Sequence, residues 1–206
     1  MNPISTIIFD IGRVLYDYVP EQLVKSVLPE SCFHELYLQH LFDTPLWLDL
    51  DRGVVSEQYA AERIANISGI RDCYTEVIYL LQNFVYHLPV LSESHNLYRQ
   101  LHADGYPIYL LTNFQEKPFE QLYEISETLQ MSVGSVVSAQ IKLMKPEPEI
   151  YLHLFEKFNL KPTECLFIDD RPENIEAAMQ LGIDGIIFTS AYKLESELYR
   201  RNLLQR

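Results

Sequence analysis

Residues 7–17 read IIFDIGRVLYD, an apolar run that ends in a carboxylate and is followed two residues later by a glycine. The apolar run Thr6–Phe9 predicts a short buried strand that leads directly into a carboxylate, Asp10. A charge at the end of a buried strand is costly unless another group compensates for it. Asp10 alone would also fit an ordinary turn, because aspartate side chains hydrogen-bond to nearby backbone. The rest of the chain must decide between these two interpretations.

Further apolar runs and helical patterns alternate along the second half of the chain. The predicted strands are 108–111, 135–138, 165–168 and 185–188, and the predicted helices between them are 92–104, 147–158 and 173–181. Strands that alternate with helices indicate a parallel sheet covered on both faces. We therefore expect an α/β fold with a Rossmann-like parallel sheet and helices on both sides.

Residues 18–88 break this alternation. They contain no convincing strand but several helical stretches, among them 56–66 and 74–85. Ligands of open α/β sheets bind beyond the carboxyl ends of the strands, and an insertion directly after the first strand lies over that place. We expect an α/β core formed by residues 1–17 and 89–206, with a helical cap domain formed by residues 18–88.

Composition excludes several classes of partner. The 206 residues are 48% hydrophobic and carry a formal net charge of −13, which disfavours binding to nucleic acid or to an anionic membrane surface. No apolar stretch approaches the roughly 20 residues of a membrane span. The N-terminus lacks the basic region of a signal peptide, and three widely spaced cysteines (Cys32, Cys73 and Cys165) suggest reduced thiols. These features favour a cytoplasmic location, and they leave the oligomeric state open.

Polar residues follow the predicted strands at the positions where ligands bind. They are Asp10, Thr112, Asn113, Asp169 and Asp170, with Lys145 just ahead of a helix. Each has an ordinary alternative role as a turn, cap or surface residue. Together they form a set that can hold a hard cation and a phosphate, because Mg²⁺ binds through carboxylates and substrate phosphate. A carboxylate can also act as a nucleophile toward phosphorus.

Four segments in order, FDIGRV, LLTN, KPEPEIY and FIDDRPENIEAA, resemble the four motifs of the haloacid dehalogenase-like superfamily. The resemblance extends over about residues 5–190 and includes the place where members with a helical cap carry it. Within the superfamily, the DxG first motif, the DD fourth motif and the cap segment LWLDLDRGVVSEQYA are most similar to the branch of bacterial α-glucose-1-phosphate phosphatases.

The resemblance implies a Mg²⁺ site built on the first and fourth motifs. Asp10 would be both the nucleophile that attacks phosphorus and a metal ligand. The backbone carbonyl of Gly12 would be a second ligand. Asp170 would bind the metal directly, and Asp169 would orient it.

The second and third motifs imply a phosphate site. Thr112 and the backbone amide of Asn113 would hold phosphate oxygens. Lys145 would neutralise the nucleophile and the phosphate. The expected partner is a small phosphorylated metabolite, with a sugar phosphate as one candidate.

Gly12 departs from the pattern of most phosphatases in this superfamily. They carry a second aspartate there, which protonates the leaving alcohol and then activates water. A general acid or base contributes ~10²–10⁴-fold in rate, so its loss favours substrates with good leaving groups, such as sugar 1-phosphates. Asp17, Asp169 or a bound water would be stand-ins. The glycine also fits a purely conformational role in a turn that needs φ > 0.

The sequence thus predicts a Mg²⁺-dependent phosphatase that acts through an aspartyl-phosphate. Two alternatives are a non-catalytic scaffold of the same fold, which Gly12 favours, and a haloacid dehalogenase. The first motif, DIGRV, does not match the DxYGT of dehalogenases, and the acidic pair at 169–170 suits a metal better. Cap residues expected to select the substrate are Trp47, Asp51 and Arg52.

Overall fold

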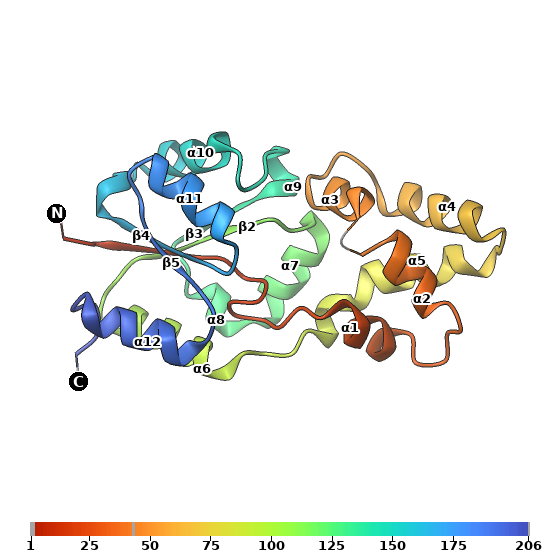
Figure 1. Ribbon diagram of the computed structural model, residues 1–206, viewed down its shortest axis with the longest axis horizontal. Helices are drawn as coiled ribbons and strands as arrows, with labels where there is room; N and C mark the ends of the chain where they lie inside the picture. Colours follow the sequence, from red (N-terminus) through yellow and green to blue (C-terminus); the bar gives the residue numbers. More distant parts are fainter. Residues whose placement is uncertain (1–2, 43, 206) are drawn as a thin grey trace.

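Five parallel strands form the centre of the protein, whose computed structural model describes residues 3–42 and 44–205. The order across the sheet is β3-β2-β1-β4-β5, and every neighbouring pair is parallel (Figure 1). The bounds are β1 Thr6–Phe9, β2 Ile108–Thr112, β3 Gly134–Val137, β4 Cys165–Asp169 and β5 Asp184–Ile187. Each predicted strand is present to within one residue at either end. Thr112 and Asp169, predicted to follow their strands, are instead the last residues of β2 and β4.

The central strand β1 is apolar at every position because both of its faces are covered. Its four residues are all buried. Ile7 and Phe9 face one apolar cluster with the helices α6 (Ser92–Ala103) and α12 (Ala191–Arg200). Ile8 faces a second cluster with α10 (Pro148–Phe158) and α11 (Pro172–Gln180). A continuous apolar run is the pattern expected of a parallel strand that is buried on both sides. The predicted α/β sheet with helices on both faces is confirmed.

The helices of the core cover the two faces of the sheet (Figure 1). The predicted helices at 92–104 and 147–158 are present and one residue shorter, and the helix predicted at 173–181 is present one residue earlier. No element was predicted where α7 and α12 lie, although both have an apolar stripe that packs inward. The bounds are α6 Ser92–Ala103, α7 Glu116–Ile125, α8 Glu127–Gln130, α9 Ser138–Ile141, α10 Pro148–Phe158, α11 Pro172–Gln180 and α12 Ala191–Arg200, with the 3₁₀ helix η2 at Pro162–Glu164.

Helices inserted after β1 gather at one end of the molecule, beyond the carboxyl ends of the strands (Figure 1). Their bounds are α1 Pro20–Val27, α2 His34–His40, α3 Pro45–Asp51, α4 Glu57–Ser68 and α5 Asp72–Asn83, followed by the 3₁₀ helix η1 at Phe84–His87. We call these helices, α1 to η1, the cap. The helical insertion is as predicted, and the domain limits at 17/18 and 88/89 stay a prediction. Within the described residues, no helix has the length and apolar character needed to cross a membrane.

The cap contacts the core closely at the end of α3. Gly53 has a φ of +71°, and a Cβ there would lie 2.5 Å from the carbonyl oxygen of Ala139 in α9. Beside it, the guanidinium of Arg52 forms an ion pair with Glu147 and donates to the carbonyl of Lys142 at 3.3 Å. Only glycine satisfies both the left-handed backbone and the close approach.

We predict that Gly53→Ala destabilises the protein more than Gly69→Ala. Gly69 also has a positive φ, +69°, but a Cβ there would meet nothing within 4 Å. The free energy of unfolding of the control, Gly69→Ala, should therefore fall only by the cost of a left-handed alanine, about 1 kcal/mol. The free energy of unfolding of Gly53→Ala should fall by roughly 1–3 kcal/mol more, because its Cβ clashes with Ala139. Urea unfolding measures both, and equal losses would mean that the cap does not depend on this contact.

Candidate active site

Strand order places the predicted residues around a single point. β1 lies between β2 and β4, and the chain leaves β1 toward β2 and β3 before it returns to β4 on the other side. Phe9 pairs with Ile168, so that Asp10 and Asp169 follow on adjacent strands. The reversal of strand order opens a crevice at the carboxyl ends, which is where open α/β sheets bind ligands. Asp10 and Asp169 flank this crevice.

Lys145 is the cation that compensates for Asp10. Its ammonium group lies 2.8 Å from Oδ1 of Asp10 and 2.7 Å from Oδ2 of Asp169, and it donates to the carbonyl of Leu111 at 2.8 Å. The lysine side chain is only 1% exposed. Burial alone would lower the pKa of Lys145, but the two carboxylates outweigh burial and raise it. All three ammonium protons thus have an acceptor, and the lysine stays charged.

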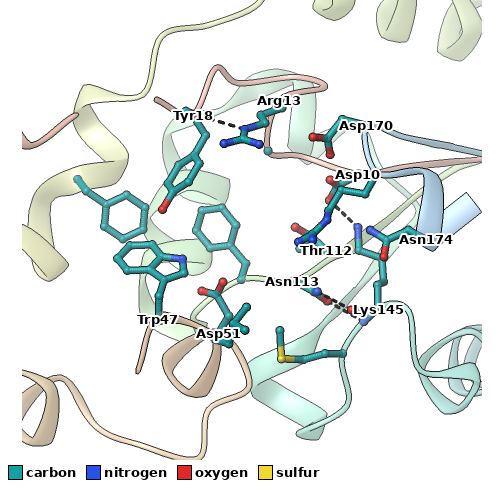
Figure 2. Close-up of a pocket in the computed structure, with 16 residues that line it drawn as sticks. Asp10, Arg13, Tyr18, Trp47, Asp51, Thr112, Asn113, Lys145, Asp170 and Asn174 are labelled. Atoms are coloured by element: carbon teal, nitrogen blue, oxygen red, sulfur yellow. Dashed lines mark hydrogen bonds and ion pairs between the residues drawn. The ribbon is translucent and has the colours of Figure 1, made fainter. Parts of the chain in front are cut away.

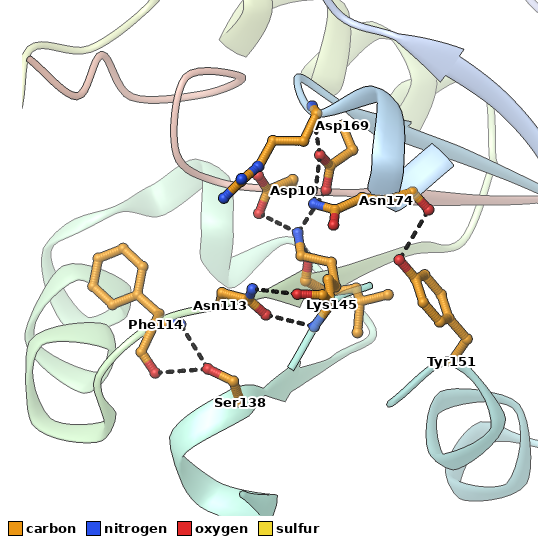
Figure 3. Close-up of polar contacts among 10 residues, drawn as sticks. Asp10, Asn113, Phe114, Ser138, Lys145, Tyr151, Asp169 and Asn174 are labelled. Carbon is orange, nitrogen blue, oxygen red and sulfur yellow. Dashed lines mark hydrogen bonds and ion pairs between the residues drawn. The ribbon is translucent and has the colours of Figure 1, made fainter. Parts of the chain in front are cut away.

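Asp169 is completely buried, and its carboxylate is held by three groups (Figure 3). Lys145 binds Oδ2, while Oδ1 accepts hydrogen bonds at 2.9 Å from the backbone N–H of Arg171 and from the side chain of Asn174. The Tyr151 hydroxyl donates to the carbonyl of Asn174 at 2.9 Å. Both oxygens of Asp169 thus orient its neighbours, and the residue does not line the pocket where it could replace the acid missing at position 12.

Asn174 and Tyr151 were not predicted as site residues. Asn174 belongs to the first turn of α11, where an asparagine is usually interpreted as a helix-start residue. Tyr151 belongs to the apolar face of α10, where an aromatic residue indicates ordinary core packing. Nothing in the motif FIDDRPEN indicates that the side chain of Asn174 reaches back to Asp169.

Asn113 positions Lys145 by two reciprocal hydrogen bonds (Figure 3). Its amide group donates to the Lys145 carbonyl, and its carbonyl oxygen accepts from the Lys145 N–H, both at 2.9 Å. The neighbouring Thr112 is buried and lines the same pocket. The asparagine side chain is therefore structural, and the phosphate contacts of Thr112 and of the Asn113 backbone amide stay predictions.

Three carboxylates form a site that fits a divalent cation. Asp10, Asp169 and Asp170 each offer an oxygen, and these oxygens lie within 4.8 Å of one another. Burial raises the pKa of Asp10 to about 7, partly offset by Lys145 and reinforced by Asp169. Burial and Asp169 also raise the pKa of Asp170. A bound cation would relieve this concentration of negative charge, and oxygen donors of this kind suit Mg²⁺.

A pocket opens above these carboxylates, between the core and the cap (Figure 2). Trp47 and Asp51, two of the three residues expected to select substrate, line it. Arg52 does not, because it turns toward Glu147 and Lys142. Asp17, expected as a stand-in acid, lies in a separate hollow beside Ser26 and His87. The structure thus removes both Asp17 and Asp169 as replacements for the missing acid.

Gly12 lines the pocket without any conformational need for glycine. Its φ is not positive, and a Cβ built there would meet nothing within 4 Å. The positive φ of this turn is carried instead by Arg13, at 57°. The conformational explanation of Gly12 was therefore wrong. Position 12 has open space for a Cβ but carries no side chain.

Comparison with known proteins agrees with this fold. The family model described as haloacid dehalogenase-like hydrolase matches residues 4–182. The chain belongs to this family, whose members are hydrolases. A crystal structure of a family enzyme from Bacteroides thetaiotaomicron, in complex with magnesium and inorganic phosphate, is similar with a TM-score of 0.74 and 21% identity, covering 91% of this chain and 95% of that one.

Two curated relatives are similar in sequence. The flavin mononucleotide hydrolase 1 of Arabidopsis thaliana is 26% identical over 161 residues, which are 74% of this chain but only 60% of the plant protein. The sesquiterpene phosphatase astK of Aspergillus oryzae is 25% identical over 191 residues, 93% of each chain. The α-glucose-1-phosphate phosphatase branch is not singled out by these similarities.

We predict that Lys145→Met destabilises the protein strongly, because it leaves Asp10 and Asp169 buried without their cation. Removal of one partner from a buried ion pair costs about 3–5 kcal/mol. Lys161→Met is the control, since Lys161 pairs with Glu164 but is 74% exposed, and such surface pairs contribute less than about 1 kcal/mol. Urea unfolding at pH 7.5 with a chelator measures both. Similar small losses in the two variants would show that the buried pair is not needed for folding.

Proposed function

We propose that the protein is a Mg²⁺-dependent phosphatase that hydrolyses a small phosphorylated metabolite through an aspartyl-phosphate on Asp10. The observation that carries this proposal is the buried Lys145, which joins Asp10 to Asp169 beside Asp170 at the base of a pocket. This arrangement supplies a fixed nucleophile and a positive charge at the same point, within a protein whose formal net charge is −13.

In the first step, a carboxylate oxygen of Asp10 attacks phosphorus and the bond to the leaving alcohol breaks. Lys145 fixes the orientation of the carboxylate and stabilises negative charge on the phosphoryl group. Thr112 and the backbone amide of Asn113 bind phosphate oxygens. Mg²⁺, held by Asp10, the Gly12 carbonyl and Asp170, would neutralise phosphate charge and so lower the barrier to attack.

In the second step, water attacks the phosphorus of the aspartyl-phosphate and releases inorganic phosphate. Asp169 keeps Lys145 in place throughout, because its second oxygen is fixed by Asn174 and by the Arg171 N–H. No side chain at position 12 protonates the leaving oxygen or activates the water. The reaction therefore favours substrates whose leaving group departs readily without a proton.

The names of the relatives support hydrolysis of a phosphate ester, but they indicate substrates that differ in the group attached to the phosphate. Their names point to flavin mononucleotide in one case and to a sesquiterpene in the other. The resemblance to the α-glucose-1-phosphate phosphatase branch supports a sugar phosphate as a further candidate. A dehalogenase is disfavoured because that chemistry has no use for the carboxylate cluster of Asp10, Asp169 and Asp170.

We predict that Asp10→Asn abolishes phosphate release from acetyl phosphate in the presence of Mg²⁺. The amide cannot attack phosphorus, and loss of a nucleophile costs on the order of 10³-fold or more in kcat. The protein should still fold, since the change is nearly isosteric. Full turnover by a folded variant would remove Asp10 as the nucleophile. If the wild type releases no phosphate from any ester or acyl phosphate, the scaffold that Gly12 favours becomes the better explanation.

We predict that Asp170→Ala raises the Mg²⁺ concentration for half-maximal activity by at least about tenfold, the size of effect seen even when groups outside the metal ligands are changed. Glu173→Ala is the control, because Glu173 lies nearby on α11 but is half-exposed and paired with Arg171. Mg²⁺ should also raise the melting temperature of the wild type and of the control more than that of Asp170→Ala. Equal metal dependence in the two variants would argue against Asp170 as a ligand.

A further inference from the structure

The wall of the pocket that faces the carboxylates is aromatic (Figure 2). Trp47 of α3 lies with its ring centroid 5.6 Å from Phe84 and 6.0 Å from Tyr18, and Phe84 lies 6.0 Å from Phe114 of the core. Leu48, which is 46% exposed, extends the same wall. We call these five residues the aromatic wall. Phe42 stacks behind Trp47 at 4.6 Å, so the wall is packed in place before any ligand arrives.

An aromatic wall suits one kind of leaving group better than another. A polyol must keep each hydroxyl hydrogen-bonded when it leaves water, and each lost hydrogen bond costs affinity. Although Arg13 and Asp51 also line the pocket, the rings of the wall and the Leu48 side chain offer few such partners. They offer apolar surface, and aromatic rings attract one another at centroid distances of about 4.5–7 Å.

The absence of an acidic side chain at Gly12 favours the same kind of leaving group for a separate, chemical reason. Without an acid at that position, the leaving oxygen must depart as an anion. A phenol has a pKa of about 10, like the tyrosine side chain, whereas an aliphatic alcohol is a far weaker acid, about as weak as water. A phenoxide therefore leaves without protonation far more readily than an alkoxide.

We propose that the substrate is a phosphate monoester of an aromatic hydroxyl compound, whose ring lies against the aromatic wall. This proposal depends on the proposed phosphatase function. In the first step, the bond between Asp10 and phosphorus forms as the bond between phosphorus and the aryl oxygen breaks, and the phenoxide leaves with the electron pair and takes a proton from solvent. Water then attacks phosphorus, loses its proton to solvent, and restores the Asp10 carboxylate with release of phosphate.

Recognition of the ring is tested with two aryl esters of similar leaving-group acidity, 2-naphthyl phosphate and phenyl phosphate. The wild type should show a kcat/KM about tenfold higher for the naphthyl ester, the factor expected when roughly 55 Å² more apolar surface is buried. Leu48→Asn should lower this ratio to about threefold or less. Leu152→Asn is the control, because Leu152 is also a half-exposed helical leucine but lies on α10 outside the pocket, and its ratio should match the wild type.

The role of Gly12 is tested with 2-phenylethyl phosphate, which keeps the ring but has an aliphatic leaving group. The wild type should hydrolyse phenyl phosphate at least about 10²-fold faster, the smaller end of the contribution of a general acid. Gly12→Asp should narrow this gap, since position 12 has room for the side chain. Equal turnover of the two esters by the wild type would overturn the proposal.

Two other results would overturn it and leave the phosphatase function in place. One is hydrolysis of acetyl phosphate that depends on Asp10, with no preference for the naphthyl over the phenyl ester. The other is a higher kcat/KM for glucose 1-phosphate than for both aryl esters. Absence of phosphate release from every compound, acetyl phosphate included, would overturn the phosphatase function and this proposal together.

Discussion

The site depends on the two ion pairs that the buried ammonium group of Lys145 forms with Asp10 and Asp169. Two carboxylates from adjacent strands, Asp10 and Asp169, come together at the edge of a sheet where neither has much access to water. Without a cation between them, like charges at this distance and burial would together oppose folding. One lysine compensates for both carboxylates, and in the proposed reaction it places a positive charge beside the nucleophile Asp10.

The fold was predictable to a large extent because its signals are local. The fully apolar run of β1 and the alternation of strands and helices after residue 89 indicate a two-faced parallel sheet. Asp10, Thr112, Asp169 and Asp170 were predictable as neighbours because parallel strands end at one edge. Lys145 reaches that edge from a loop, and its position came from the resemblance of its motif and not from any period in the sequence.

Other parts of the site could not be predicted because they depend on packing between distant segments. Asn174 and Tyr151 support Asp169 from two different helices. Asp17 is close to Asp10 in the sequence but lines a separate hollow. The aromatic wall joins residues from positions 18, 47, 48, 84 and 114, and no local pattern in the sequence brings these positions together.

The contact between Arg52 and Glu147 has a mechanical consequence. Glu147 also accepts a hydrogen bond from the backbone N–H of Met144, and Arg52 donates to the carbonyl of Lys142. Arg52 of the cap therefore contacts the segment that carries Lys145 on both sides of the lysine. On the core side, Asn113 holds the same segment through the backbone of Lys145. Displacement of the cap from the core would therefore break the Arg52 contacts, which are one of the two sets of contacts that hold this segment. The junction between cap and core and the placement of the Lys145 ammonium group thus depend on the same six residues, 142–147.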